Sequence, residues 1–190
     1  NINPGGPAGG SGNQYFIGHF DGERFTPDDD SVFNGEAPVG SLIADFEESE
    51  SESGWTATTN GAVQSWYDPI ESIFDGNYQT YCYMTNRSGE LQLDIDMGKP
   101  YSFDGIKMTT SGYDYETWEE TEAGAFSAGM TVSTSDNGTD WKSQGEVEGD
   151  AEACVFYAPL TARYIRISVP NAGGWYGATL QCGVFNVYAK

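Results

Sequence analysis

From residue 54 onward, apolar and polar residues follow the pattern of short β-strands. Apolar side chains alternate with polar ones along Leu91–Met97, and the same alternation recurs along Tyr164–Val169. A period of two places successive side chains on opposite faces of a strand, one buried and one in water. Another alternation begins at Ile106, and Val184–Tyr188 predicts a closing strand. Many short strands joined by glycine-rich turns predict an all-β sandwich.

One short segment carries helical signals. Asp68 suits the N-cap, Pro69 the first helical position and Glu71 the first turn. The segment is expected to end near Asp75–Gly76.

Residues 1–30 differ in character from the rest of the chain. Pro4–Gly12 is a loop by composition, and the pair Asp21–Gly22 lies between two aromatic-rich runs. An Asp-Gly pair favours positive φ at both turn positions, so a two-residue β-hairpin is predicted here as an appendage. Residues 31–53 are expected to form an acidic linker to the sandwich at 54–190.

Four motifs occur in order within the predicted sandwich. They are Ile73-Phe-Asp-Gly-Asn-Tyr-Gln-Thr-Tyr81, Leu93-Asp-Ile-Asp-Met-Gly-Lys99, Thr134-Ser-Asp-Asn-Gly-Thr-Asp-Trp141 and Ala162-Arg-Tyr-Ile-Arg-Ile167. Together they resemble the discoidin domain, also called the F5/8 type C or galactose-binding-like domain, which includes modules of carbohydrate-binding family 32. The resemblance covers roughly residues 54–190. It implies a discoidin-like jelly-roll β-sandwich that binds a ligand with loops at one end and performs no chemistry.

The N-terminal segment carries a second resemblance. Asn3-Pro-Gly-Gly-Pro-Ala-Gly-Gly-Ser-Gly12 and Gln14-Tyr-Phe-Ile-Gly-His-Phe-Asp-Gly-Glu-Arg-Phe-Thr26 are similar to a late propeller blade of glycoside hydrolase family 32, the invertases and levanases. The family continues toward an Asp-Tyr-Gly-Lys-Asp-Phe-Tyr-Ala type segment, whereas this chain passes into an acidic stretch. Two explanations stay open. The binding domain is inserted into, or fused after, a propeller, or the hairpin is a relic in a protein without a complete hydrolase.

Catalysis by this chain itself is not expected. Family 32 hydrolysis needs one carboxylate as nucleophile and another as general acid. The family's Trp-Met-Asn-Asp-Pro, Arg-Asp-Pro and Glu-Cys motifs are absent from the sequence. The resemblance implies a parent protein that is a fructan-type glycoside hydrolase and is secreted, periplasmic or on the cell surface.

Composition and charge narrow the expected partners. The 190 residues are 38% hydrophobic and 14% aromatic, which is enough for a sizeable core, and 29 acids against 8 bases give a formal net charge of −21. A surface this acidic repels phosphate backbones and anionic lipids. Neither nucleic acid nor a membrane surface is therefore an expected partner. Membrane insertion is not expected either, because no apolar run approaches the length of a span.

The three cysteines lack metal-ligand spacing, and the chain has one histidine, so a zinc site is not expected. The default interpretation of Cys82, Cys154 and Cys182 is small buried hydrophobes. One disulfide plus one free thiol is the alternative.

The Asp-Gly-Asn turn is the candidate metal site. In sugar-binding members of the discoidin family this turn commonly holds calcium, and Asp75, Asn77 and Thr80 are the matching positions. Calcium prefers carboxylate, amide, hydroxyl and carbonyl oxygens in one tight loop. A glutamate that the family often adds before the last strand is missing, since Gly183 and Val184 stand there. Alternatively, Asp75 is a plain turn residue whose carboxylate accepts backbone N–H groups.

Aromatic residues in loops are the candidate sugar contacts, because aromatic faces stack on C–H-rich surfaces of sugars. The predicted ligand-binding residues are Trp175, Tyr176, Trp66, Tyr67, Asn86 and Arg87. A further group, Tyr113, Tyr115 and Trp118, lies in an acidic loop. Alternatively, these rings cap the open ends of the sandwich.

Arginine and histidine positions distinguish this chain from galactose-binding relatives. Those relatives hold axial hydroxyls with His, Arg and Asn side chains, but His19 lies outside the sandwich. Arg163 and Arg166 match strand positions and are expected to pair with Asp94 or Asp96. Arg87 is then the one arginine in a loop.

These observations favour a non-catalytic carbohydrate-binding module of a fructan-type glycoside hydrolase, which concentrates the enzyme on a polysaccharide or oligosaccharide. The alternative is a structural or protein-interaction sandwich that packs on an adjacent catalytic domain and has lost its ligand site. The missing histidine supports the alternative, and the loop aromatics support the module. An enzyme in its own right is the least favoured class, because no nucleophile–base or carboxylate pair has motif support.

Overall fold

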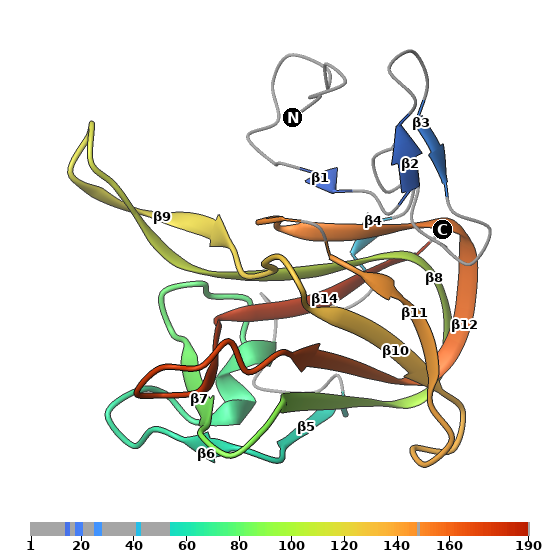
Figure 1. Cartoon of the computed structure of the whole chain (residues 1–190), viewed down its shortest axis with the longest axis horizontal. Coiled ribbons are helices and arrows are strands. Elements are labelled where there is room, and N and C mark those ends of the chain that lie inside the picture. Colours follow the sequence, from blue (N-terminus) through green and yellow to red (C-terminus); the bar gives the residue numbers. More distant parts are fainter. Residues whose placement is uncertain are drawn as a thin grey trace.

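The computed structural model describes residues 14–15, 18–20, 25–27, 41–42, 54–147 and 149–189. Most of the predicted hairpin segment and acidic linker therefore lies outside the described residues. The described chain is a β-sandwich with one short 3₁₀ helix, as the sequence pattern predicts (Figure 1).

The strands form a large sheet, a small sheet and a separate hairpin. The large sheet contains β1 (Gln14–Tyr15), β4 (Ser41–Leu42), β5 (Thr56–Thr59), β8 (Leu91–Asp114), β9 (Glu119–Gly124), β10 (Thr131–Ser135), β11 (Lys142–Glu146), β12 (Ala153–Val169) and β14 (Val184–Ala189). The small sheet contains β6 (Ala62–Val63), β7 (Cys82–Asn86) and β13 (Ala178–Cys182). The hairpin consists of β2 (Gly18–Phe20) and β3 (Phe25–Pro27), and the 3₁₀ helix η1 spans Ile70–Phe74.

Strand order follows from the pairing of the two long strands, β8 and β12. The large sheet runs β11–β10–β12–β8–β14–β4, with β5 and β9 also paired to β8 and β1 paired to β12. The small sheet runs β13–β7–β6. The β1–β12 pair is parallel, whereas the other described pairs are antiparallel.

A single hydrophobic core joins the two sheets. Leu91, Leu93 and Ile95 of β8 are fully buried, whereas the polar residues between them are partly exposed. This confirms the alternation predicted for the segment. Met84 of β7 and Leu180 of β13 belong to the same buried cluster, so the small sheet packs its inner face on β8 and its neighbours.

The two long strands are longer than the sequence predicts, and each runs through a proline. Separate strands are expected on either side of Pro100, but β8 is one strand of 24 residues. β12 likewise runs through Pro159 for 17 residues, although its predicted start is near Arg163. Proline lacks the N–H that a ladder needs. Both prolines fall where the β8–β12 register shifts, so no ladder bond is required of them.

The helical segment begins later than predicted. Pro69 occupies the N-cap position of η1, and no side chain caps the helix. Asp68, the predicted cap, instead accepts the N–H of Tyr81 on Oδ2 at 3.2 Å. The helix ends at Phe74, as expected, and Asp75 follows it.

Both predicted hairpins are present, with longer connections than a two-residue turn. In the N-terminal hairpin, Phe20 pairs with Phe25, which leaves four residues between the strands and corrects the two-residue prediction. Four-residue connections are also common in hairpins. The Asn137–Gly138 pair lies between β10 and β11, and Gly138 has a φ of +75° there.

The strand arginines are structural, as predicted. Arg166 donates from Nε and Nη2 to the two carboxylate oxygens of Asp94, at 2.6 and 2.7 Å, and Arg163 forms the same fork with Asp96 at 2.7 and 2.8 Å. The Trp141 ring centroid lies 4.0 Å from Cζ of Arg166. Both guanidinium groups are therefore committed to holding β12 against β8.

The three cysteines are buried free thiols, which is the default interpretation of the sequence. Burial raises the pKa of Cys82 to about 11, and it raises the pKa values of Cys154 and Cys182 as well. Among the described residues, no helix has the length and apolar character needed to cross a membrane.

Candidate ligand-binding site

Arg87 lies in a tight turn at the end of β7, and Asn86 closes this turn. The Asn86 Nδ2 donates to the Glu90 carbonyl at 2.9 Å, and its Oδ1 accepts the N–H of Ser88 at 3.1 Å. Asn86, a predicted ligand contact, therefore uses its amide within the turn. Its evident effect is to fix the position of Arg87.

The loop between β12 and β13 packs against the same turn. The β13–β7 register places Ala178 opposite Asn86, so the residues just before Ala178 reach the Arg87 turn. Gly177 has a φ of +71°, and a Cβ there would lie 2.6 Å from Cα of Arg87. Only glycine satisfies both demands without strain. Asn171 adds a weak hydrogen bond from Nδ2 to the Arg87 carbonyl at 3.4 Å.

This packing brings together three predicted ligand contacts from distant parts of the chain. Cζ of Arg87 lies 5.8 Å from the centroid of the Trp175 ring and 6.0 Å from that of Tyr176. Trp175 is 79% exposed and Tyr176 is also exposed. The cluster thus combines aromatic faces open to solvent with a guanidinium that has five N–H donors.

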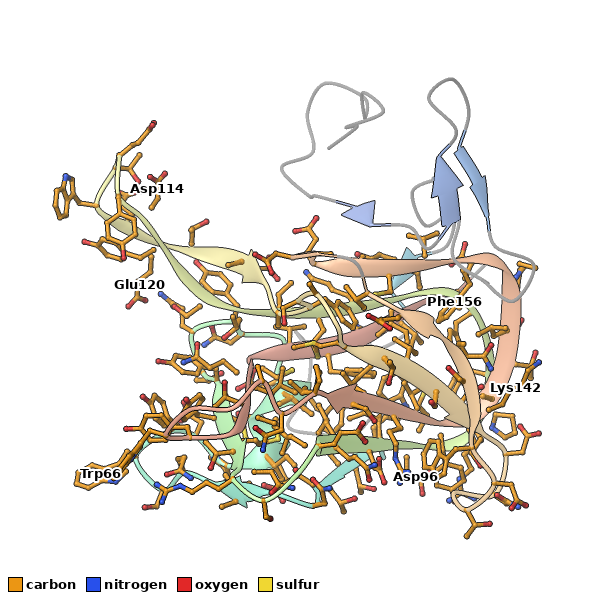
Figure 2. All side chains as sticks on the ribbon, in the orientation of Figure 1. Trp66, Asp96, Asp114, Glu120, Lys142 and Phe156 are labelled. Atoms are coloured by element: carbon orange, nitrogen blue, oxygen red, sulfur yellow. The ribbon has the colours of Figure 1, made fainter. Side chains whose placement is uncertain are left out.

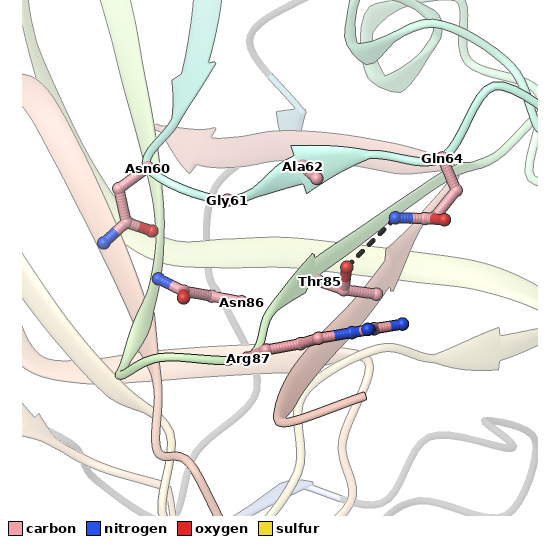
Figure 3. Close-up of a pocket in the computed structure, with 7 residues that line it drawn as sticks. All are labelled: Asn60, Gly61, Ala62, Gln64, Thr85, Asn86 and Arg87. Atoms are coloured by element: carbon pink, nitrogen blue, oxygen red, sulfur yellow. Dashed lines mark hydrogen bonds between the residues drawn. The ribbon is translucent and has the colours of Figure 1, made fainter. Parts of the chain in front are cut away.

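A pocket of about 410 Å³ opens beside the cluster (Figure 3). Its lining consists of Asn60, Gly61, Ala62, Gln64, Thr85, Asn86 and Arg87. Gln64 donates from Nε2 to Oγ1 of Thr85 at 3.0 Å (Figure 3). The volume suits a small ligand or part of a larger one.

Gln64 and Thr85 are site residues that the sequence did not single out. The β6–β7 pairing, with Val63 opposite Met84 and Ala62 opposite Thr85, places them side by side. No local sequence pattern distinguishes either residue, so only the pairing of the two strands identifies them as neighbours in the pocket.

Trp66 and Tyr67 lie on the loop after β6, close in sequence to Gln64. Trp66 is 92% exposed. Tyr67 instead packs against Tyr81 and Tyr83, with ring centroids 5.3 and 5.2 Å apart. Burial, with a smaller contribution from Tyr67, raises the pKa of Tyr81, so this packed phenol stays neutral. Trp66 therefore presents a free ring, and Tyr67 belongs to a small aromatic cluster.

The predicted metal residues lie together in the turn after η1. Oδ1 of Asp75 accepts the N–H of Asn77 at 2.8 Å, and Oδ2 accepts the Thr80 hydroxyl at 2.5 Å. These are the bonds of a plain turn, yet every atom involved on the acceptor side is a hard oxygen of the kind that calcium prefers. Asp75 is the one carboxylate of the three, and the described residues contain no cluster of three or more His, Cys, Asp and Glu side chains able to hold a metal.

Gly183 explains why no glutamate completes this turn. A Cβ at residue 183 would lie 2.7 Å from the carbonyl oxygen of Tyr78 and 3.0 Å from its Cα. The backbone of Gly183, just before β14, therefore lies close to Tyr78 of this turn, and a side chain at this position would push the turn away.

Solved structures with the same fold include carbohydrate-binding modules. The chitosan-binding module 1 of a chitosanase/glucanase from Paenibacillus sp. IK-5 gives a TM-score of 0.54 at 19% identity, covering 70% of this chain and 94% of that one. The family 32 module of NanJ from C. perfringens, solved in complex with galactose, gives a TM-score of 0.51 at 22% identity, covering 71% and 93%. Identities this low establish a shared fold.

Curated relatives match shorter stretches. A putative glycosyl hydrolase of Aspergillus rugulosus is 48% identical over 80 residues, which is 40% of this chain and 11% of that protein. An extracellular exo-inulinase of Aspergillus niger is 64% identical over 36 residues, 18% of this chain and 7% of that protein. An invertase of Debaryomyces hansenii is 75% identical over 28 residues, 15% and 5%. Part of the chain is therefore similar to invertase-type hydrolases, as predicted, and the chain spans at most 11% of these relatives' length.

The sandwich itself matches a known protein family. The family model of the F5/8 type C domain matches residues 54–182, which include the four sequence motifs and the cluster of Arg87, Trp175 and Tyr176. The chain belongs to the F5/8 type C domain family.

Proposed function

We propose that this domain is a non-catalytic carbohydrate-binding module of an extracellular glycoside hydrolase. The observation that carries the proposal is the cluster of Arg87, Trp175 and Tyr176 at the edge of the pocket. Exposed ring faces stack on the C–H face of a sugar, and a guanidinium donates to its hydroxyl oxygens. The pocket supplies a concave surface lined mainly by polar side chains, which can orient a bound sugar.

The proposed ligand is a fructan polysaccharide or oligosaccharide, and the proposed parent is a fructan-cleaving hydrolase. The matches to an exo-inulinase and an invertase support this choice. The relatives named as extracellular support a secreted or cell-surface location. A module of this kind raises the concentration of its catalytic partner at the polysaccharide surface.

The pocket residues support binding without hydrolysis. Glycoside hydrolysis ordinarily needs two carboxyl groups that flank the scissile bond. None of the seven residues that line the pocket is Asp, Glu or His. The isolated domain is therefore expected to release no reducing sugar from levan, inulin or sucrose.

We also propose that calcium binds the turn of Asp75, Asn77 and Thr80 and stabilises it. The three residues supply a carboxylate, an amide, a hydroxyl and a backbone carbonyl, all hard oxygen donors. Calcium would have to compete with the Asn77 N–H and the Thr80 hydroxyl for the carboxylate. Its proposed role is structural, because the turn does not line the pocket.

A glycan array followed by titration calorimetry tests the main proposal. The intact domain is expected to bind inulin or levan oligosaccharides, and Arg87→Ala is expected to weaken binding about tenfold, the usual effect of losing a good polar contact. Lys142→Ala is the matched control, because it removes one exposed positive charge. Figure 2 places Lys142 on the side of the sandwich away from Trp66.

The outcomes separate the module from its alternative. Binding that falls in Arg87→Ala and persists in Lys142→Ala supports the proposed site. Failure of the intact domain to bind any glycan would favour a sandwich that packs on a neighbouring domain and has lost its ligand site.

A further inference from the structure

The hairpin of β8 and β9 projects from the body of the sandwich (Figure 1, upper left). Its strands remain paired out to Asp114 opposite Glu119. We call residues 109–124 the finger. Figure 2 places Asp114 at the outer end of the finger and Trp66 at the lower edge of the molecule, so the finger tip is distant from the loop that carries Trp66.

Three exposed aromatic side chains occupy the tip of the finger. Tyr115 is 75% exposed and Trp118 is 72% exposed. Tyr113 contacts both rings edge to face, with centroids 5.2 Å from Tyr115 and 6.3 Å from Trp118. The Tyr113 hydroxyl also donates to the Trp118 carbonyl at 3.2 Å. These contacts hold the rings in place while leaving most of their surface in water.

The same tip is strongly acidic. Asp114, Glu116, Glu119 and Glu120 lie on it, and residues 109–124 contain no Lys, Arg or His. None of these four carboxylates forms a salt bridge with another described residue, whereas Glu122, nearer the body, is paired with a lysine. The N–H groups of Glu116 and Thr117 lower the pKa of Asp114, so its charge persists into mild acid.

The composition of the finger is unsuited to a protein interface. A stable protein interface needs a packed apolar centre from which charged residues are depleted. Residues 111–122 contain no Val, Ile, Leu, Met or Phe, and carboxylates stand on both sides of the rings. A sugar does not need a packed apolar centre, because aromatic ring faces and a few polar groups are enough to bind it.

The charge then selects among sugars. Neutral and cationic sugars can both donate hydroxyl hydrogen bonds to these carboxylates, whereas only the ammonium group of an amino sugar also pairs with their charge, and that group is attracted to aromatic faces as well. We propose that the finger tip is a second carbohydrate site, which binds chains of cationic amino sugars through Tyr115 and Trp118 with the surrounding carboxylates. This site is independent of the pocket beside Arg87 and of the proposed fructan ligand.

The test uses three probes of matched length at mildly acidic pH, where the amino groups of the glucosamine and lysine probes are protonated. The probes are a glucosamine hexamer, its fully N-acetylated counterpart, which is neutral, and hexalysine, which has charge without a sugar ring. Binding is measured by titration calorimetry on the intact chain at two salt concentrations.

Two finger variants and one control complete the design. Trp118→Asn removes the ring, and asparagine tolerates the left-handed backbone (φ +60°) found at this position. Glu116→Gln removes a charge and keeps the shape of the side chain. Trp175→Ala is the control, because it removes an exposed ring at the pocket and leaves the finger intact.

The glucosamine hexamer is expected to bind at least about tenfold more tightly than the other two probes. Trp118→Asn is expected to abolish most of this binding, Glu116→Gln to weaken it several-fold, and added salt to weaken it further. Trp175→Ala should leave it unchanged. The proposal is overturned if the glucosamine hexamer does not bind, if hexalysine binds equally well, if Trp118→Asn binds normally, or if Trp175→Ala abolishes binding.

Discussion

The substitution Trp175→Ala separates a ligand-contacting ring from a ring that merely covers the core. Because Trp175 is 79% exposed, about a fifth of the roughly 250 Å² that a large aromatic side chain can bury is removed from water, or about 50 Å². At about 25 cal/mol per Å², this burial contributes about 1.3 kcal/mol. The exposed cation–π contact with Arg87 adds about 0.5–1 kcal/mol. The free energy of unfolding should therefore fall by about 2 kcal/mol.

Trp55→Ala provides the comparison for a ring that belongs to the core. Trp55 is 7% exposed and packs edge to face on Phe74 and Tyr101, with ring centroids 6.1 and 5.8 Å away. Its loss should cost about 3–5 kcal/mol, as large aromatic truncations in cores do. Urea unfolding of both variants measures the difference, and titration with inulin oligosaccharides measures binding.

Trp175→Ala is expected to lose affinity for the oligosaccharide by about tenfold or more, as an anchor residue does. A stability loss as large as that of Trp55→Ala would mean that the ring is a cap for the core. Undiminished binding would remove Trp175 from the site, whatever its effect on stability.

Three further predictions concern charge, thiols and metal. The hydrogen-bonded Arg163 guanidinium lowers the pKa of Asp96, so the folded state binds fewer protons than the unfolded state. The stability that the Asp96–Arg163 pair contributes is therefore present above the ordinary pKa of an aspartate, and it is lost as pH falls through the lowered pKa of the folded state. Asp96→Asn should therefore be less stable at neutral pH by about 1 kcal/mol and should converge with the unsubstituted protein in acid unfolding curves. The pKa of Cys82 is raised to about 11 and all three thiols are buried, so the native protein at neutral pH should resist alkylation by iodoacetamide. Mass spectrometry should find three alkylated cysteines only after unfolding, and rapid labelling of the native protein would contradict this. After bound metal has been removed by chelation, calcium added at about 100 times its dissociation constant should stabilise the domain by about 2.7 kcal/mol. Asp75→Asn should lose that response, and a melting curve of the unsubstituted domain that calcium does not change would leave Asp75 as a plain turn residue.

The sandwich was predictable because its signals are local. Alternation along Leu91–Met97 depends on neighbouring residues alone, and it correctly predicts which side chains are buried. The polar positions of that strand also made the pairing of Arg163 and Arg166 with its aspartates predictable. Continuity of β8 through Pro100 was not predictable, because it depends on a register shift against β12 that no local pattern encodes.

The candidate site was predictable in its exposed members and not in its lining. Trp175 and Arg87 stand out because each lies among turn residues with no strand to explain it. Gln64 and Thr85 become neighbours only through the β6–β7 pairing. Their role therefore depends on contacts between residues far apart in sequence, which the identity of each residue does not reveal.

β8 sets the register of much of the large sheet, because it pairs along its length with β5, β12, β14 and β9. Removing one residue from its middle would send every following side chain to the opposite face and misalign several ladders at once. Residues 115–118 connect β8 to β9 and belong to neither strand. Evolutionary insertions and deletions should accordingly avoid the interior of β8, and an epitope tag or a fluorescent reporter should not be grafted into it.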